Sequence, residues 1–407
     1  MSKTVALLSG KGGSGKTTLS LSMASMLSSC GIKVLVVDCD LSTNGATYFY
    51  EERLTENKGN ICAFYDVITM QTNIVLEAIH ITDFFDFIPS IKRISKETTN
   101  TFSFSEGDEK RWEIFKEKLA IMYDVILLDC QAGYADILKT ILPSVDVSLV
   151  VMETDAISSS AIRSLYLKIG EIIDEKKTYQ VFNKVSSDEY ENYSKISGGT
   201  VFVNIETVLF DWKIRKAFSV AQIPDMEHSS ANYGAQVFNI CKILFTDSSC
   251  QKKLQKYGTV IELKKRTEDK ERLEKKIQQA QAVQKKERNK ILRKLYTLVI
   301  PAMLVLSLLL FWVIISQKNI FSEATSTAFS TTLAVTALMG TLLITWLSIF
   351  ELLKDRKSRF IEVESYKVDL SNINKSINEL QKYIADTKNQ NISNSKTKRT
   401  YRRKKEG

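Results

Sequence analysis

Short apolar runs, each followed by a turn and a longer amphipathic stretch, recur through the first half of the chain. Three of them read as buried strands, at residues 4–9, 31–40 and 123–129, and the first leads into a predicted helix that ends near Cys30. Buried strands that alternate with helices form parallel sheets. We therefore predict an α/β fold over residues 1–250, with a doubly wound, mostly parallel sheet.

Two later runs are much longer and contain no charged residue. They cover residues 295–315 and 324–350, and a helix needs about 20 apolar residues to cross a bilayer. The pattern predicts two transmembrane helices, 295–315 and 326–350, joined by a short external link at 316–325. The alternative is a pair of buried core helices in a globular domain.

Charge is distributed unevenly along the chain. Residues 1–250 carry a net charge of −8 and residues 251–407 a net charge of +17, which together make the overall +9. Lys and Arg cluster on the outer flanks of both apolar runs, so the positive-inside rule places both termini in the cytoplasm. The expected location is the cytoplasmic membrane, as a multi-pass protein. The six Cys contain no C-x-x-C pair and fit a reducing compartment.

The segments that flank the two apolar runs are predicted to be helical. Apolar residues recur at steps of three and four between Val363 and Ile384, which is a heptad pattern. We expect 251–294 to form a basic stalk helix and 351–388 a coiled-coil helix, paired with each other or with another subunit. The polar, basic tail at 389–407 is expected to be disordered and could contact anionic lipid.

A glycine-rich turn follows the first predicted strand and carries the clearest chemical signal. Its spacing matches G-x-x-x-x-G-K-[ST], the phosphate-binding P-loop, in the strand–turn–helix context that this motif requires. Lys16 would reach the β- and γ-phosphates, and the Thr17 hydroxyl would bind Mg²⁺. The expected nucleotide-binding residues are Gly10, Lys11, Gly12, Gly13, Ser14, Gly15, Lys16, Thr17 and Thr18.

Carboxylates stand at the ends of the second and third predicted strands. The second strand ends in Asp38 and Asp40, and the third in Asp129. An apolar strand with a terminal Asp is the Walker B pattern, in which the carboxylate holds Mg²⁺ directly or through water. We predict Thr17, Asp38 and Asp129 as the metal-binding residues, although a strand-end Asp can also be only a helix cap.

The loop and the carboxylates together resemble a specific family. Lys11 directly follows the first glycine, and K-G-G-x-G-K-T-T is similar to the deviant Walker A motif of the ParA/MinD ATPases. The segment 38–47 resembles their switch I and 129–133 their switch II, where Gln131 stands in place of a common Pro. The resemblance extends over about residues 3–245, and it is most specific at the P-loop.

This resemblance implies a mechanism and further site residues. It implies that ATP joins two copies in a sandwich dimer, with Lys11 reaching the partner's site and Asp40 orienting the attacking water. Lys11, Lys16 and Asp40 are then the expected catalytic residues. Asn183 and Pro224 resemble the positions that flank adenine. Since Ser186 stands where a guanine-reading N-K-x-D motif has Asp, the expected cofactors are ATP and Mg²⁺.

We considered several functions for such a chain. The favoured one is a membrane-anchored ATPase that acts as a dimerisation switch and recruits, positions or regulates an unknown protein partner. The alternatives are an ATP-bound scaffold with little or no hydrolysis, and a regulator that resembles exopolysaccharide tyrosine autokinases. DNA partitioning is disfavoured because the ATPase half is acidic, whereas DNA contact needs basic residues.

Overall fold

The computed structural model describes most of the first half of the chain and parts of the second. The described residues are 2–56, 61–69, 77–92, 107–194, 201–222, 229–294 and 363–385, together with isolated residues between 296 and 346. The chain divides into two compact units, Met1–Lys265 and Arg266–Gly407.

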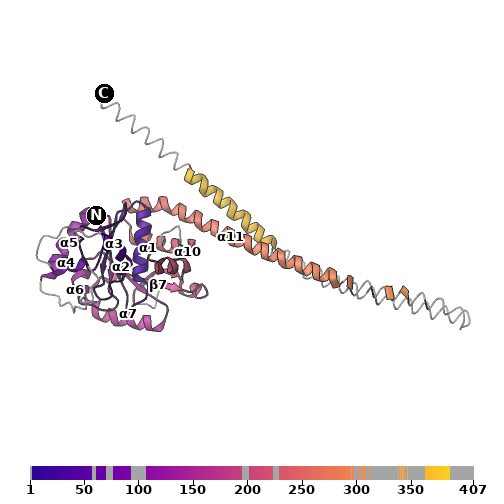
Figure 1. The fold of residues 1–407 in the computed structure, drawn as a ribbon, viewed down its shortest axis with the longest axis horizontal. Helices are drawn as coiled ribbons and strands as arrows, with labels where there is room; N and C mark the ends of the chain where they lie inside the picture. The colour runs from indigo at the N-terminus through magenta and orange to yellow at the C-terminus, as the bar shows by residue number, and fades with distance from the viewer. Residues whose placement is uncertain are drawn as a thin grey trace, which may run out of the picture. The chain divides into compact units, whose positions relative to one another are not determined.

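The first unit is built on one eight-stranded sheet (Figure 1). The strand order is β3-β4-β2-β5-β1-β6-β7-β8, and each neighbouring pair is parallel except β3 and β4. The strands are β1 (Lys3–Leu8), β2 (Val34–Cys39), β3 (Ile79–Thr82), β4 (Phe85–Ile88), β5 (Val125–Cys130), β6 (Val147–Met152), β7 (Thr178–Val185) and β8 (Val203–Leu209). The predicted α/β class with a mostly parallel sheet is confirmed.

Helices cover both faces of this sheet (Figure 1). One buried cluster joins the sheet to α1 and α10, and a second joins the opposite face to α5, α6 and α7. The helices are α1 (Lys16–Ser29), α2 (Gly45–Phe49), α3 (Glu51–Glu56), α4 (Phe64–Thr69), α5 (Asp108–Met122), α6 (Ile137–Ile141), α7 (Ala156–Ile169), α8 (Tyr190–Ser194), α9 (Trp212–Ser219), α10 (Ala231–Leu244) and α11 (Ser248–Lys294). Because both faces are covered, the central strands are buried and mostly apolar, and these are the runs that predict the fold.

The beginning of α11 packs on the rest of the first unit. Leu254 and Ile261 are buried in the same cluster as α1 and α10. The Lys253 ammonium donates to the Gly31 carbonyl oxygen at 2.9 Å, just beyond the end of α1. The compact unit therefore extends past residue 250 to Lys265.

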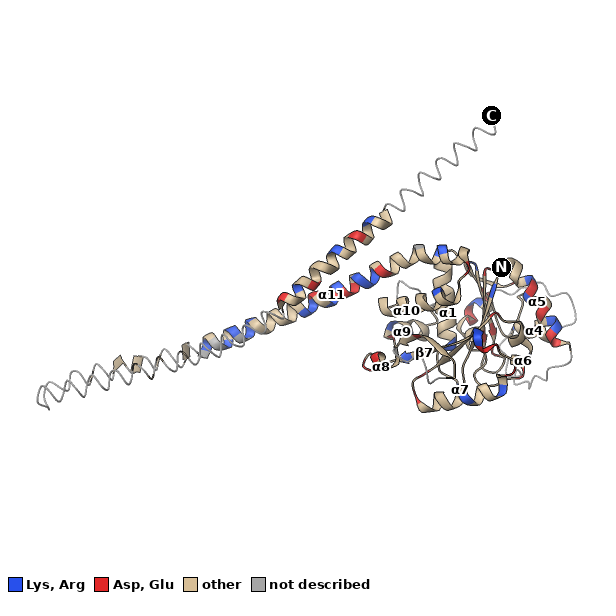
Figure 2. Ribbon diagram, turned by 180° about the vertical axis from the view of Figure 1, so that it is seen from behind, with Lys and Arg blue, Asp and Glu red and all other residues tan. Residues whose placement is uncertain are grey.

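The later part of α11 and a separate helix belong to the second unit. Figure 2 shows basic and acidic residues interspersed along α11. Residues 363–385 are helical, with Val363 and Ile377 buried. The structure shows a helix here but does not support the coiled coil predicted for 351–388, of which 351–362 and 386–388 lie outside the described residues.

The predicted membrane localisation needs correction. Within the part of the chain that the structure describes, no helix combines the length and the apolar character that crossing a bilayer requires. The longest described helix, α11, carries charged residues along its length. This finding contradicts the expected multi-pass location in the cytoplasmic membrane with both termini in the cytoplasm. Most of 295–315 and 326–350, and all of 316–325 and 389–407, lie outside the described residues.

Candidate functional site

The P-loop connects β1 to α1 at the carboxyl end of the sheet. Gly13 and Gly15 have φ values of 83° and 93°, a left-handed conformation that glycine adopts at little cost. A Cβ on Gly10 would lie 2.4 Å from the backbone carbon of Ala161 in α7. These glycines let the loop turn tightly, and α1 begins directly after it at Lys16, which is buried.

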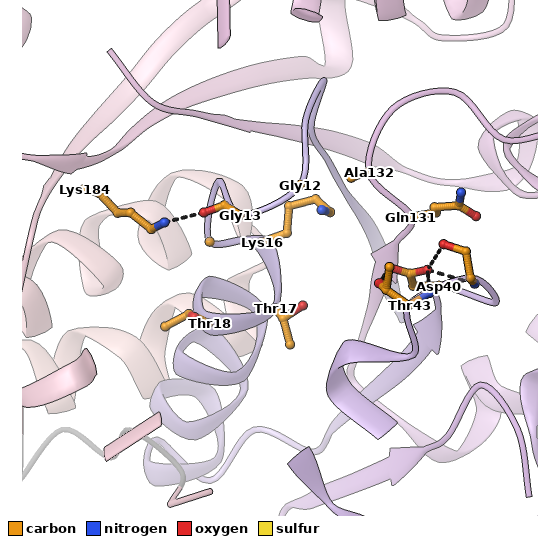
Figure 3. Close-up of a pocket in the computed structure, with 12 residues that line it drawn as sticks. Gly12, Gly13, Lys16, Thr17, Thr18, Asp40, Thr43, Gln131, Ala132 and Lys184 are labelled. Carbon is orange, nitrogen blue, oxygen red and sulfur yellow. Dashed lines mark hydrogen bonds between the residues drawn. The ribbon is translucent and has the colours of Figure 1, made fainter. Parts of the chain in front are cut away.

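A cavity of about 470 Å³ opens over this loop (Figure 3). It is lined by the P-loop, by the loop after β2, by the loop after β5 and by one residue of β7. The lining residues are Gly12, Gly13, Gly15, Lys16, Thr17, Thr18, Asp40, Ser42, Thr43, Gln131, Ala132 and Lys184. Backbone N–H groups of such a loop and the N-terminus of the following helix favour bound phosphate.

Asp38 and Asp129 lie side by side near the carboxyl ends of their strands. They are paired in register on β2 and β5, and both are buried. Burial raises the pKa of each carboxyl above the usual range of aspartate; the negative charge of Asp129 raises that of Asp38 further, while the Lys16 ammonium opposes the rise at Asp129. A cation bound here would stabilise the ionised form of both.

The two carboxylates differ in their hydrogen bonds. Asp38 accepts hydrogen bonds from the backbone N–H of Asp40 at 3.0 Å and from the N–H and hydroxyl of Thr47 at 2.8 and 2.7 Å. The Oδ1 atom of Asp129 is buried and has no hydrogen-bond partner in the structure. Asp38 therefore holds the loop after β2 in place, whereas Asp129 keeps an oxygen available for a ligand.

Asp40 organises the turn that follows β2. Its Oδ1 atom accepts hydrogen bonds from the backbone N–H groups of Ser42 and Thr43 at 3.0 and 2.8 Å and from the Ser42 hydroxyl at 2.9 Å. The Thr43 hydroxyl donates to Oδ2. A carboxylate oxygen has two lone pairs, so Oδ2 can still accept a hydrogen bond from a water in the cavity.

Lys11 is held by carboxylates of its own chain and does not line the cavity. Its ammonium lies 2.9 Å from Asp155 Oδ2 and 3.3 Å from Glu153 Oε2. The hydrogen bond to Asp155 is the main cause that raises the pKa of Lys11. Asp155 also caps α7 by accepting from the Ser158 N–H at 2.9 Å. Lys11 is thus anchored at the start of α7, beside the phosphate site.

Asn183 supports the P-loop from β7. Its Nδ2 atom donates to the Ser14 carbonyl oxygen at 2.8 Å, and the residue is buried. A Cβ on Gly15 would lie 2.3 Å from this nitrogen, so glycine is needed there for a second reason. Pro224, the other expected base-flanking residue, lies outside the described residues.

The structure brings most of the predicted site residues to one place and separates one from them. Lys16, Thr17, Asp40 and most of the P-loop line the cavity. Asp38 and Asp129 pair on the neighbouring strands β2 and β5, whereas Lys11 is turned toward α7. Sequence reasoning missed the roles of Glu153, Asp155 and Lys184. Among these, Asp155 had an available signal, since Asp directly before a helical apolar pattern is a typical N-cap residue.

The residues at the cavity fit a bound Mg²⁺. Proteins hold this ion with one or two carboxylates, while substrate phosphates and water supply the remaining ligands. Thr17 lines the cavity, and the Asp129 Oδ1 atom has no other partner. Over the described ranges, no group of three or more His, Cys, Asp and Glu side chains could hold a metal ion by itself.

Several solved structures are similar to the larger part of the chain. No curated protein matches the chain. Among solved structures, a candidate plasmid partition protein from Borrelia burgdorferi B31 bound to AMPPNP is 18% identical, with a TM-score of 0.49, over 60% of this chain and 98% of its own. The MinD cell division protein of Aquifex aeolicus is 17% identical, with a TM-score of 0.46, over 61% and 98%.

A third similar structure is the septum site-determining protein MinD of Pyrococcus horikoshii OT3, complexed with Mg-ADP. It is 18% identical, with a TM-score of 0.40, over 63% of this chain and 95% of its own. At the level of families, residues 2–181, which contain the P-loop and strands β1 to β6, match the model described as an AAA domain.

Proposed function

We propose that this chain is a Mg²⁺-dependent ATP hydrolase that acts as a dimerisation switch. In this proposal ATP joins two copies of the nucleotide-binding unit, and hydrolysis separates them. The output is the recruitment, positioning or regulation of a partner protein. The observation that carries the proposal is the position of Lys11. Its ammonium lies beside the phosphate site, but carboxylates of the same chain hold it outside the cavity.

The P-loop supplies the binding of the triphosphate. Lys16 lines the cavity at the start of α1, and its charge counters that of the phosphates. The backbone N–H groups of the loop surround the same space. This arrangement binds the triphosphate in the ground state, and it also stabilises charge that spreads over the γ-phosphoryl oxygens in the transition state.

Thr17 and Asp129 are the residues that would hold Mg²⁺, which when bound neutralises charge on the phosphates. Asp38 contributes by keeping the loop after β2 in position through Thr47. Asp40 lies across the cavity from Lys184 (Figure 3). Its Oδ2 atom would accept a hydrogen bond from the attacking water and direct the water oxygen toward the γ-phosphorus.

Hydrolysis needs further positive charge, and we propose that Lys11 of a second copy supplies it. Within one copy, Asp155 and Glu153 hold the Lys11 ammonium beside the start of α7. Both pairs are partly exposed to solvent, and water strongly screens the attraction in such ion pairs. Moving Lys11 to a triphosphate, with its larger negative charge, is therefore energetically accessible when a second copy approaches.

The test compares the wild-type chain with Lys16→Ala, Lys11→Ala and Asp40→Ala. Steady-state ATP hydrolysis is measured with Mg²⁺, and the mass in solution is measured by light scattering with and without ATP. Lys177→Ala is the matched control, since Lys177 is an exposed lysine in an ion pair just before β7.

We expect Lys16→Ala to lose ATP binding, Lys11→Ala to bind ATP without hydrolysing it, and Asp40→Ala to accumulate as an ATP-bound dimer. Lys177→Ala should behave like the wild type. If Lys11→Ala hydrolyses ATP at the wild-type rate, the proposal that Lys11 acts on a second copy is wrong. If the wild type binds ATP and dimerises without turnover, the scaffold alternative replaces the switch.

A further inference from the structure

Gln131 is a cavity residue that has no role in the proposed function so far. It lies in the loop after β5, where it stands in place of a common Pro in the segment that resembles switch II. The side-chain amide of glutamine has an oxygen acceptor and two N–H donors, whereas the side chain of Pro has neither. The exchange therefore adds hydrogen-bonding groups to the wall of the cavity.

The register of the sheet places Gln131 beside Asp40. Cys39 of β2 and Cys130 of β5 are partners in register, and Asp40 and Gln131 are the residues that directly follow them. Neighbouring strands lie about 4.8 Å apart, so the two segments leave the sheet side by side. Figure 3 shows Gln131 and Asp40 on the same side of the P-loop, with Lys184 on the other side.

The loop that carries Gln131 is tied to the beginning of the P-loop. The backbone N–H of Gly133 donates to the Ser9 carbonyl oxygen at 2.8 Å, and a Cβ on Gly133 would lie 3.6 Å from the Gly10 carbonyl oxygen. Gln131 itself is half-buried, and its amide hydrogen-bonds to none of the residues that the structure describes. The backbone is thus held in place, while the amide is available to a ligand in the cavity.

Asp129 indicates which end of a bound triphosphate would lie near Gln131. The Asp129 Oδ1 atom and Thr17 are the groups proposed to hold Mg²⁺, and in P-loop enzymes this ion bridges the β- and γ-phosphates. Gln131 comes two residues after Asp129, on the side of Asp40. Its amide therefore belongs at the γ-phosphoryl end, where water attacks.

Asp40 alone leaves the orientation of this water incomplete. Its Oδ1 atom already accepts three hydrogen bonds from Ser42 and Thr43, and its Oδ2 atom accepts one from the Thr43 hydroxyl. The remaining lone pair of Oδ2 would hold one hydrogen of a water molecule, and the water could still rotate about that hydrogen bond. A second acceptor would fix the other hydrogen and so direct a lone pair of the water oxygen at the phosphorus.

We propose that Gln131 is a water-positioning residue for ATP hydrolysis. Its Oε1 atom accepts a hydrogen bond from the water that Asp40 holds, and its amide N–H donates to an oxygen of the γ-phosphoryl group. The inference rests on the proposed function for the orientation of the nucleotide and for the role of Asp40.

The reaction that this pair of residues serves is the ordinary hydrolysis of a phosphoanhydride. The water oxygen forms a bond to the γ-phosphorus, and the bond from that phosphorus to the bridging oxygen breaks. The electron pair of the broken bond stays on ADP, and one proton of the water passes to an oxygen of the same phosphoryl group. Gln131 donates and accepts hydrogen bonds only, and it is unchanged at the end.

The test compares the ground state with the transition state in the full chain with Mg²⁺. Calorimetry measures the affinity for AMPPNP and for ADP with aluminium fluoride, which imitates the phosphoryl group in transfer. Steady-state hydrolysis of ATP gives kcat and KM. The variants are Gln131→Met, which keeps the length of the side chain without the amide, and Gln131→Ala. Gln279→Met, at an exposed glutamine of α11, is the matched control, and thermal melting checks that each variant is folded.

We expect both Gln131 variants to lower kcat about 10- to 100-fold, because hydrogen bonds to the water and to the charged phosphoryl group are lost. The affinity for ADP with aluminium fluoride should fall by about the same factor as kcat. The affinity for AMPPNP should change less than about twofold, and Gln279→Met should behave like the wild type. A merely structural role would weaken both ligands alike, so the ratio of the two affinities is the decisive readout.

Three results would overturn the inference and leave the proposed function in place. The first is an unchanged kcat in the Gln131 variants when the wild type hydrolyses ATP. The second is an equal loss of affinity for AMPPNP and for ADP with aluminium fluoride, since Gln131 would then act in binding. The third is loss of the ATP-dependent dimer in light scattering, which would place Gln131 at the interface between copies. A wild type that binds ATP without turnover refutes the proposed function itself, and this inference with it.

Discussion

Replacing Leu254 with alanine tests whether the start of α11 belongs to the same cooperative unit as the nucleotide-binding sheet. Leu254 is fully buried in the cluster that contains α1 and α10. Around it, the Gln251 side-chain amide donates to the Lys242 and Phe245 carbonyl oxygens at 2.8 Å each, at the end of α10. The contacts predict that α11 cannot separate from this unit without disturbing its core.

The magnitude follows from the burial of this side chain. Leucine loses three carbon atoms on becoming alanine, and transfer of each from the core to water costs ~0.8 kcal/mol, which makes ~2.4 kcal/mol in all. The cavity that remains adds to this value, so we expect Leu254→Ala to lower the free energy of unfolding by about 3–5 kcal/mol. Leu292 lies on the same helix with 43% of its surface exposed, and Leu292→Ala should change the free energy by ~0.5 kcal/mol or less.

The assay is urea unfolding of the full chain, followed by tryptophan fluorescence. Of the four tryptophans, Trp112 is fully buried and the other three are exposed. Trp112 lies in the cluster on the opposite face of the sheet from Leu254, so its signal reports unfolding of the whole unit. If Leu254→Ala and Leu292→Ala unfold at the same urea concentration, α11 is not part of that unit and the reasoning is refuted.

Three further predictions concern the site. Gly10→Ala should weaken AMPPNP binding more than about tenfold, because its Cβ would meet the backbone of α7 at 2.4 Å. Gly45→Ala, whose Cβ would make only an ordinary contact at 3.6 Å, should bind AMPPNP normally. Equal AMPPNP binding by the two variants would contradict the packing argument. Because burial raises the pKa of Asp129, a proton should compete with Mg²⁺ there, and the affinity for Mg-ATP should fall between about pH 7 and 5, where an ordinary aspartate of pKa ~3.9 stays ionised. A parallel titration in EDTA corrects for protonation of ATP itself. If the metal-dependent part of the ATP affinity does not change with pH, this reasoning is refuted. Asp155→Asn keeps the α7 cap but removes the charge that holds Lys11, so the ATP-dependent dimer should form at a severalfold lower protein concentration in light scattering, and a higher one would show that Asp155 acts in the dimer instead.

Much of the fold was predictable because its signals are local. Buried parallel strands are mostly apolar on both faces, so β1, β2 and β5 stand out as short runs in the sequence. The P-loop is recognisable since its glycines, Lys16 and Thr17 act within one continuous turn. Asp38 and Asp129 could be expected near each other because carboxyl ends of parallel strands meet at one edge of the sheet.

The long apolar runs show where pattern reasoning was not enough. Hydrophobic length alone predicted a two-span protein of the cytoplasmic membrane. In the part of the chain that the structure describes, no helix satisfies the requirement for length and apolar character together.

The sequence by itself determined the apolar strands, the glycine-rich loop and the carboxylates at the strand ends, since each depends on neighbours in the chain, whereas the order of the strands depends on pairs as distant as Lys3 and Val125. Only the tertiary structure decided where Lys11 and Lys184 point. Lys11 pairs with Asp155, which is 144 residues away, and a shift in register between β7 and β8 turns Lys184 onto Gly13. No periodicity encodes such contacts, because they form between side chains that only the packed sheet brings within hydrogen-bond distance.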